Sequence, residues 1–256
     1  MNPRDLIRRP LYRLYEQRIL RSLDQMPHHI GVIHDGHRRF ARESGLPDYE
    51  AGYRVGMDKV VEFLAWCDDF EIPAVTCWLL SQQNLNRRLD ELKPYYGVLM
   101  ELFDRLPDSI SDARVGVVGS LHLLPEDLRR SAERLVQRCG SGSRRITIAL
   151  AYGGRQEIID AVRDLVAKLG AEGLVGEDLI AGIDADALEA HLYTSDLPDP
   201  DLVIRTSGES RLSGFLLWQA AYAEYSFVDV YWPEFRRVDF LRALREYTLR
   251  ERRFGR

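Results

Sequence analysis

Two short segments of this 256-residue chain gather side chains that can bind an anion or a metal ion. The first, residues 34–39, reads His-Asp-Gly-His-Arg-Arg and leads into a predicted helix. Gly36 allows a ligand to approach the backbone, and the free N–H groups of a helix start favour an anion. Arg39 adds a permanent cation whose planar fork matches diphosphate oxygens. On local evidence alone, an ordinary helix cap by Asp35 is the simpler interpretation.

A rival interpretation of the same segment is a transition-metal cluster. His34, Asp35 and His37 are ligand types that zinc accepts. No further ligand motif, such as two histidines four residues apart, stands nearby. The zinc interpretation is therefore the weaker one.

The second segment, residues 205–215, combines two arginines with glycine and serine positions ahead of a predicted helix, so it resembles a small phosphate-gripping loop. Arg205 ends an apolar strand, where an unpaired charge is costly, so its partner is either Glu209 or a ligand phosphate. Glu224 closes the predicted helix over 215–224. It is either a solvated cap or, with Asp35, a ligand for Mg²⁺, which prefers a few carboxylates plus substrate phosphates.

The elements that must position these segments follow from hydrophobic patterning. Short β-branched runs predict strands over 29–34, 74–80, 114–118, 146–151, 202–205 and 227–231. Helical periodicity lies between them, over 53–70, 91–106, 126–139, 155–169 and 215–224, with a last helix over 238–253. A small helical insert is expected within 170–199. This alternation predicts an α/β fold, a single domain whose central, mostly parallel sheet of about six strands is flanked by helices. Ligands of such sheets bind beyond the carboxyl ends of the strands.

The composition excludes several classes of protein. A formal charge of -5 argues against a nucleic-acid partner, which needs a basic face. The apolar runs are far shorter than the ~20 residues that cross a bilayer. Three widely spaced cysteines form neither a disulfide framework nor a metal motif, so we expect a cytoplasmic protein.

Residues 1–25 form a predicted amphipathic helical arm ahead of the main domain, residues 26–256. Six arginines alternate with apolar residues along this arm. Two interpretations stay open. The arm packs on the body or on a partner subunit, or it lies peripherally on the inner face of the plasma membrane.

Several segments together resemble the cis-prenyltransferase family, which includes undecaprenyl diphosphate synthases. They are residues 35–41, residues 81–87, the Tyr-Gly-Gly-Arg turn at 152–155, and residues 201–235. The ending over 250–255 is similar to the family's Arg-x-Gly tail. Each motif is weak alone, but their shared order from about residue 26 to the end makes the joint signal strong.

The resemblance implies a magnesium-dependent catalytic domain over 26–256. Its reaction would join isopentenyl diphosphate to a short allylic diphosphate and release diphosphate. Asp35 looks like the magnesium-binding catalytic aspartate, and Glu224 resembles a further magnesium ligand. Asn84 resembles the residue that assists removal of the proton from isopentenyl diphosphate.

The resemblance also implies two diphosphate sites and a homodimer. The positions similar to the allylic site are Gly36, His37, Arg38, Arg39, Phe40, Ser81, Gln82, Gln83, Leu85 and Arg87. Those similar to the isopentenyl diphosphate site are Arg205, Arg211, Leu212, Ser213, Arg253 and Gly255. The last two lie in a tail that, in this family, completes the neighbouring subunit's site, and residues 222–231 would lie near the dimer contact.

The chain departs from the family pattern at several positions. His37 replaces the usual Asn, His34 the usual Met, Tyr53 the usual His, and Ser210 a usual His. Two bulky residues, Met57 and Leu79, stand where long-chain members resemble one another in having smaller ones. Because packed interiors resist extra methylenes, they predict a short product, with (2Z,6E)-farnesyl diphosphate from geranyl diphosphate the best candidate.

Alternatives to this function stay open. One is a synthase of longer polyprenyl chains, and another is a non-catalytic partner subunit of a separate prenyltransferase. A third is a phosphate-ester hydrolase that uses the histidine cluster. The intact Asp35, Arg205 and Arg211 favour a self-sufficient enzyme over a non-catalytic subunit.

Overall fold

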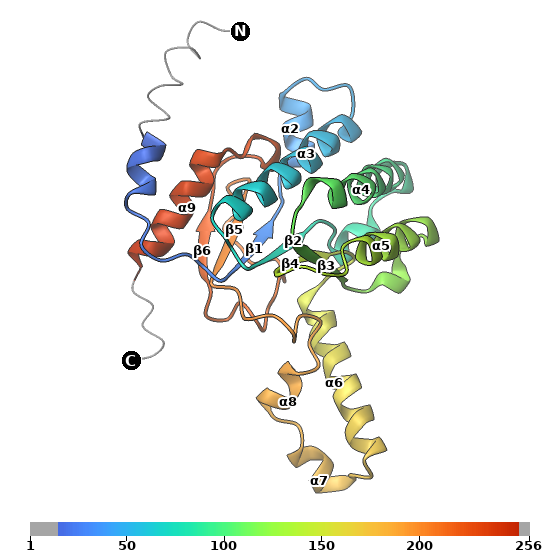
Figure 1. Ribbon diagram of the computed structural model, residues 1–256. Helices are drawn as coiled ribbons and strands as arrows, with labels where there is room; N and C mark the ends of the chain where they lie inside the picture. The colour runs from blue at the N-terminus through green and yellow to red at the C-terminus, as the bar shows by residue number, and fades with distance from the viewer. Residues whose placement is uncertain (1–14, 251–256) are drawn as a thin grey trace, which may run out of the picture.

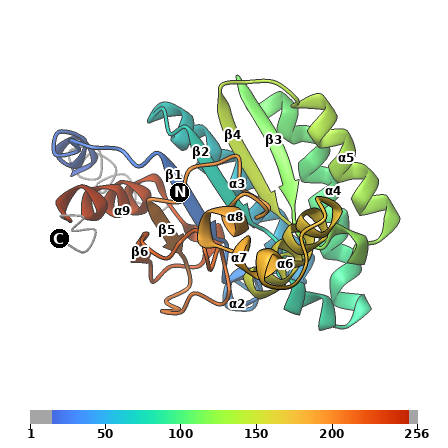
Figure 2. The same ribbon diagram turned by 90° about the horizontal axis from the view of Figure 1, so that it is seen from below.

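A computed structural model describes residues 15–250 and contains one six-stranded parallel sheet, in the order β3-β4-β2-β1-β5-β6 (Figures 1 and 2). The strands are β1 (His29–Ile33), β2 (Ala74–Trp78), β3 (Ala113–Val118), β4 (Arg144–Ala149), β5 (Leu202–Arg205) and β6 (Glu224–Phe227). The longer helices are α3 (Tyr49–Asp69), α4 (Leu89–Ser109), α5 (Glu126–Arg138), α6 (Gly154–Ala171) and α9 (Arg237–Leu249). The shorter ones are α2 (His37–Glu43), α7 (Gly176–Ala181), α8 (Ala185–Glu189) and the 3₁₀ turns η1 (Gln82–Asn86), η2 (Leu121–Leu123) and η3 (Trp232–Glu234). The predicted α/β fold is confirmed.

The two central strands explain why the sequence showed continuous apolar runs. Every residue of β1 and β2 is buried, because helices or loops cover both faces of the sheet. On one face, side chains from α3, α4, α5 and α9 pack into the main core with Val32 and Cys77. On the other face, Ile33 and Trp78 pack against Phe215 and Tyr152, which come from loops. The carboxyl ends of β1, β2 and β5 therefore end between two differently built layers.

The predicted helix over 215–224 is wrong. The chain there forms a series of turns, and residues 224–227 instead pair with β5 as strand β6. Gly214 and Leu216 have φ angles of 90° and 43°, a left-handed conformation that a right-handed helix cannot include. The predicted strand over 227–231 is displaced for the same reason, since the edge of the sheet is already filled by β6.

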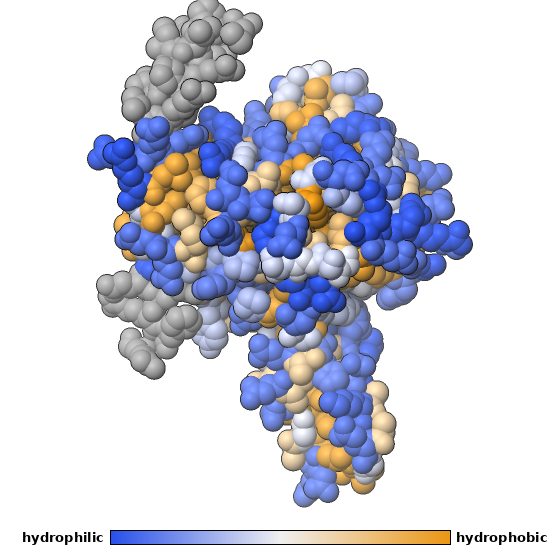
Figure 3. All heavy atoms as spheres, in the orientation of Figure 1, coloured by the Kyte–Doolittle hydropathy of each residue, from blue (hydrophilic) through white to orange (hydrophobic). Residues whose placement is uncertain are grey.

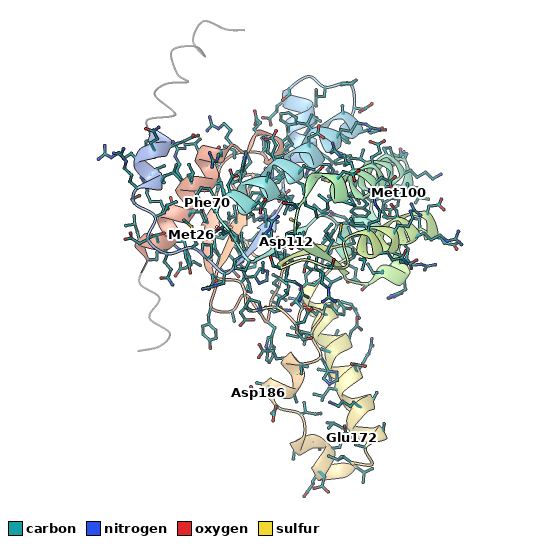
Figure 4. The ribbon with its side chains drawn as sticks, in the orientation of Figure 1. Met26, Phe70, Met100, Asp112, Glu172 and Asp186 are labelled. Carbon is teal, nitrogen blue, oxygen red and sulfur yellow. The ribbon has the colours of Figure 1, made fainter. Side chains whose placement is uncertain are left out.

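The insert predicted within 170–199 contains α7 and α8, which lie beyond the end of α6. Together these three helices project from the body, with Glu172 and Asp186 on the projecting part (Figures 1 and 4). Val175 and Ile180 remain 74% and 68% exposed on it, and apolar residues are visible on its surface in Figure 3. The projecting part formed by α6, α7 and α8 extends away from the carboxyl ends of β1 and β5 (Figure 1).

The described part of the N-terminal arm packs on α9. Residues 15–20 are helical, and Ile19 is fully buried. The Arg242 guanidinium donates to Tyr15 Oη at 3.4 Å, and Thr248 Oγ1 donates to the Gln25 carbonyl. Apolar residues gather where this helix meets α9 (Figure 3). Between residues 15 and 250, no helix is both long and apolar enough to traverse a bilayer.

Candidate active site

A cavity of about 840 Å³ opens at the carboxyl ends of β1, β2 and β5. Most of the predicted site residues line it, although they come from segments up to 178 positions apart. They are Asp35, Gly36, His37, Arg38, Arg39, Leu79, Ser81, Gln83, Asn84, Arg87, Arg205, Arg211 and Ser213. The two anion-binding segments of the sequence therefore face one shared space.

Asp35 and Arg205 form the centre of this cavity. Register pairs Ile33 with Arg205, so the residues that end β1 and β5 lie side by side. Arg205 Nη2 donates to Asp35 Oδ2 at 2.9 Å, and the Gly36 N–H donates to Asp35 Oδ1 at 2.9 Å. The Arg205 side chain is 3% exposed and that of Asp35 is 37% exposed. A buried cation thus holds a carboxylate that still faces the cavity.

The turn between β1 and α2 requires glycine at position 36. Gly36 has a φ of 105°, and a Cβ there would lie 2.7 Å from a Tyr231 ring atom. The Thr206 hydroxyl fixes the turn, since it accepts from the Asp35 N–H and donates to the Asp35 carbonyl. Gly36 and His37, at the start of α2, both line the cavity.

The loop after β5 and helix α2 supply the remaining cations on this side. Besides Asp35, Arg205 contacts Ser213 Oγ at 2.7 Å and the Arg211 carbonyl. Arg211 Nη1 lies 2.6 Å from Glu209 Oε2, so Glu209 pairs with Arg211 and not with Arg205 as one of the sequence alternatives held. Arg39 reaches across from α2 and donates to Ser207 Oγ at 2.8 Å. Arginine contacts therefore join α2, the turn before it, β5 and the loop after β5.

The turn η1 positions Asn84 and Arg87 at the opposite wall. The Ser81 hydroxyl caps this turn by accepting from the Asn84 N–H at 3.1 Å. Arg87 and Arg38 both lie near Glu91 Oε1, at 3.1 and 3.2 Å. This places a second pair of arginines at the cavity, held by a carboxylate in the first turn of α4.

The side of the cavity that faces the main core is aromatic and apolar. The rings of Tyr53 and Tyr95 lie 4.5 Å apart, and the His37 ring lies 5.9 Å from Tyr53. Tyr95 Oη donates to the Leu79 carbonyl, which fixes Leu79 beside these rings. His34 lines the same side and packs edge-on against Trp232, with ring centroids 4.1 Å apart. This wall can accept a hydrocarbon but not a second diphosphate.

Both histidines of the first segment are neutral parts of this wall. Burial lowers the pKa of His34 to about 3 and that of His37 to about 4. His34 Nδ1 lies 3.3 Å from the Trp78 carbonyl, and His37 Nε2 lies against Gly56. Among residues 15–250 no group of three His, Cys, Asp or Glu side chains is arranged to hold a metal ion. The described residues therefore give the zinc-cluster interpretation no support.

Asp35 by itself suits a magnesium ion that substrate also coordinates. Its carboxylate is a hard oxygen ligand exposed to a cavity whose cations attract phosphate. Mg²⁺ is usually bound by one or two carboxylates plus substrate phosphates and water. The donor set therefore fits magnesium better than a transition metal.

A family model matches residues 33–255 of the chain, and its description is "Putative undecaprenyl diphosphate synthase". The chain belongs to the cis-prenyltransferase family. The matched range contains all of the cavity-lining segments described above. The family predicted from the sequence motifs is confirmed, and so is the general activity class, prenyl transfer.

Curated cis-prenyltransferases resemble the chain over almost its whole length. A (2Z,6E)-farnesyl diphosphate synthase from Mycolicibacterium smegmatis is 48% identical, covering 97% of this chain and 97% of that protein. A tritrans,polycis-undecaprenyl-diphosphate synthase from Methanopyrus kandleri is also 48% identical, covering 97% and 92%. A solved lavandulyl diphosphate synthase from Lavandula x intermedia, in complex with dimethylallyl diphosphate, has a TM-score of 0.83 and 32% identity over 90% of this chain and 99% of that one. Overall identity does not separate short-chain from long-chain cis-prenyltransferases.

Glu224 does not join Asp35 in this chain. It pairs with Leu202 at the beginning of β5, whereas Asp35 follows the end of β1. Its carboxylate contacts Arg250 instead. Because Glu224 lies at the amino end of the sheet, the predicted magnesium pairing of these two carboxylates is not formed within one copy of the chain.

Several other expected site residues lie outside the cavity. Met57 is fully buried in the main core and is not among the residues that line this cavity, so its effect on product length stays a prediction. Leu85 packs against that core too. Phe40, Gln82 and Leu212 are absent from the cavity lining. Arg253 and Gly255 lie outside the described residues.

Sequence reasoning missed Tyr95, Trp78 and Tyr49, which also line the cavity. Tyr95 was part of a helix with ordinary apolar spacing, and Trp78 was part of an apolar strand. The position of Trp78 at the end of β2 was the one available signal, because ligands gather beyond strand carboxyl ends. Nothing in the sequence distinguished Tyr95 from its core neighbours.

Proposed function

We propose that this cis-prenyltransferase condenses isopentenyl diphosphate with a short allylic diphosphate, with geranyl diphosphate favoured, and releases diphosphate. The product proposed is a short Z-prenyl diphosphate, (2Z,6E)-farnesyl diphosphate. The observation that carries this proposal is the contact of Asp35 with Arg205 inside a single cavity. One side of that cavity is cationic and the other is aromatic and apolar. Such a space suits two diphosphates and one hydrocarbon chain.

The two diphosphate sites follow the two groups of arginines. Arg205, Arg211 and Ser213 belong to the loop after β5 and are assigned to isopentenyl diphosphate. Arg38, Arg39 and Arg87, together with the cavity-lining backbone at the start of α2, are assigned to the allylic diphosphate. Asp35 lies between the two groups and is the residue assigned to hold Mg²⁺. When bound, that ion would offset negative charge on the departing diphosphate.

The residues of the chain act mainly by fixed charge. As the allylic carbon–oxygen bond breaks, the arginines stabilise the negative charge that collects on diphosphate. The terminal alkene carbon of isopentenyl diphosphate forms the new bond to the allylic carbon, and loss of a C2 proton creates the Z double bond. An amide is a poor base near pH 7, so we assign Asn84 to orient this proton toward a diphosphate oxygen.

A short product is favoured by the apolar wall. Leu79 lines the cavity at 6% exposure and is held by Tyr95, whose ring in turn packs against that of Tyr53 at a tilt of 50°. Bulky side chains in a packed interior do not yield to extra isoprene units without a cost of roughly 1–3 kcal/mol. The name of the M. smegmatis relative agrees with a C15 product, while that of the M. kandleri relative keeps a longer chain as the second candidate.

The assay that tests this function follows label from isopentenyl diphosphate into solvent-extractable product. Purified protein with Mg²⁺ and geranyl diphosphate should give C15 material after dephosphorylation, and omission of either substrate should abolish it. A non-catalytic subunit would incorporate no label. A hydrolase would release phosphate from geranyl diphosphate alone.

We also propose a cytoplasmic homodimer. Strand β6 is an edge of the sheet; its last residue, Phe227, is 41% exposed, and Tyr222, two residues before the strand, is 77% exposed. An exposed edge with apolar neighbours supports pairing with a second copy. The three cysteines are free and buried, as is usual in a reducing compartment. Light scattering should give twice the 29.5 kDa of one chain.

A peripheral contact of the N-terminal arm, residues 1–25, with a membrane is tested by flotation of the protein with anionic vesicles.

A further inference from the structure

Protein carboxylates already pair with the arginines assigned to diphosphate binding. Arg205 contacts Asp35, while Arg38 and Arg87 share Glu91. Arg39 and Arg211, one from each proposed diphosphate site, share Glu209. A ligand diphosphate therefore does not meet bare cations. It competes with carboxylates for the same guanidinium groups.

Glu209 differs from the other two carboxylates in how it is held. Its Oε1 lies 3.4 Å from Arg39 Nη2 and its Oε2 lies 2.6 Å from Arg211 Nη1. Asp35 is also fixed by the Gly36 N–H, and Glu91 is also near the Tyr53 hydroxyl and the N-terminus of α4. Within residues 15–250, the Glu209 carboxylate contacts these two arginines alone.

The backbone around Glu209 can release it without breaking a helix or strand. Residues 206–215 are loop and turn, and Ser207 and Gly208 have φ angles of 79° and 71°. The Glu209 side chain is 27% exposed and lines the cavity, so water can receive the displaced carboxylate. Arg39 retains Ser207 Oγ as a partner when Glu209 leaves.

We propose that Glu209 is an internal counter-ion for the two diphosphate sites, which incoming diphosphate displaces and which returns as product diphosphate leaves. This inference rests on the proposed function, because it takes Arg39 and Arg211 as diphosphate ligands. A diphosphate carries more charge and more oxygens than a carboxylate, so it displaces Glu209 from the two arginines. Its affinity is lower than it would be for the same arginines without Glu209. Glu209 acts through the arginines and is a positioning residue. Its effect is to keep diphosphate release from becoming slow.

Calorimetric binding of inorganic diphosphate, with Mg²⁺ present, tests this directly. Glu209→Gln removes the negative charge but keeps the size, and it should bind inorganic diphosphate about tenfold more tightly than the native chain. Glu209→Asp retains the charge and should bind within about threefold of native. The matched control is Glu62→Gln, which makes the same charge change at an exposed side chain on α3 that pairs with Lys59, and it should leave binding unchanged.

Turnover provides a second readout that a purely structural role would not move. Glu209→Gln should lower the KM for isopentenyl diphosphate and increase inhibition by inorganic diphosphate, while kcat stays the same or falls. A loop that merely lost its structure would raise KM instead. Thermal unfolding of Glu209→Gln and of Glu209→Ala identifies a folding defect, and either folded variant suffices for the test.

The possible outcomes distinguish failure of the Glu209 inference from failure of the proposed prenyltransferase function. If inorganic diphosphate binds neither the native chain nor the variants, the proposed diphosphate sites are wrong. If it binds the native chain and Glu209→Gln equally, or the variant more weakly, the sites stand and the counter-ion inference is overturned.

Discussion

The two sides of the cavity are held together by different forces. On the cationic side, arginines from α2, from the end of β5 and from the loops after η1 and β5 are fixed by charged hydrogen bonds such as that between Arg205 and Asp35. On the apolar side, Leu79 and Tyr95 are fixed by packing between β2 and α4. Charged contacts at a partly exposed edge can exchange partners, whereas a packed wall cannot. The cationic side is therefore suited to cycles of binding and release, and the apolar side to measuring length.

The largest expected effect comes from the centre of the cationic side. Asp35→Ala should lower kcat by about a thousandfold or more, since it removes the proposed metal ligand and the partner of Arg205. Asp35→Asn keeps an oxygen for Arg205 without the charge, and should be nearly as inactive. Steady-state assays measure the loss, and circular dichroism checks the fold. Near-normal turnover in either folded variant would refute the assignment.

Arg205→Lys should have the next largest effect. A lysine cannot contact Asp35, Ser213 and the Arg211 carbonyl together, because its ammonium is a single point rather than a fork. We expect kcat/KM for isopentenyl diphosphate to fall roughly a hundredfold, comparable to one lost oxyanion contact. Arg54→Lys, at an exposed ion pair on α3, serves as control. If only the KM for geranyl diphosphate rose, Arg205 would belong to the allylic diphosphate site and the two site assignments would have to be exchanged.

Two substitutions of bulky residues sharpen the contrast on the apolar side. Leu79→Ala should lengthen the product while kcat stays within about tenfold, because Leu79 lines the cavity. Met57→Ala should leave the product unchanged and lower the free energy of unfolding by about 2–4 kcal/mol, because Met57 is buried in the core behind it. Chromatography and denaturant unfolding report the two outcomes. Longer products from Met57→Ala alone would show that the growing chain extends past Met57 and not past Leu79.

The smallest effect lies at the amino end of the sheet, away from both sides. Burial lowers the pKa of His29 below 6.5, and the ring bonds Pro198 and Thr76. At pH values below 6.5 the unfolded chain therefore binds a proton that the folded chain refuses. As the pH is lowered below 6.5, the free energy of unfolding should therefore decrease, by at most about 1.4 kcal/mol per pH unit for this one group.

Burial lowers the pKa values of His34 and His37 as well, so these residues add to the same pH dependence. The contribution of His29 is therefore measured by comparing the native chain with a His29 variant. His29→Asn should show a shallower pH dependence of unfolding than the native chain, with unchanged kcat at neutral pH. An identical slope would mean that His29 is not a neutral buried group.

The sequence predicted the cationic side far better than the apolar side. Asp35 and Arg205 each directly follow a strand, and parallel topology brings such positions to one edge. Tyr95 and Met57 instead lie in helices of ordinary apolar spacing, and only the rotation of α3 and α4 decides which of them faces the cavity. Glu224 was misplaced because the left-handed residues near Gly214 replaced a predicted helix with turns and moved the last strand.

Two diphosphates must occupy one cavity together for the proposed reaction, and calorimetry tests this most directly. The native chain is titrated with isopentenyl diphosphate in the presence and absence of a saturating, non-reactive geranyl thiolodiphosphate. The account predicts one isopentenyl diphosphate bound per chain in both titrations, with Arg211→Ala weakening only that ligand. Loss of isopentenyl diphosphate binding in the presence of the geranyl analogue, as for competition at a single site, would contradict it.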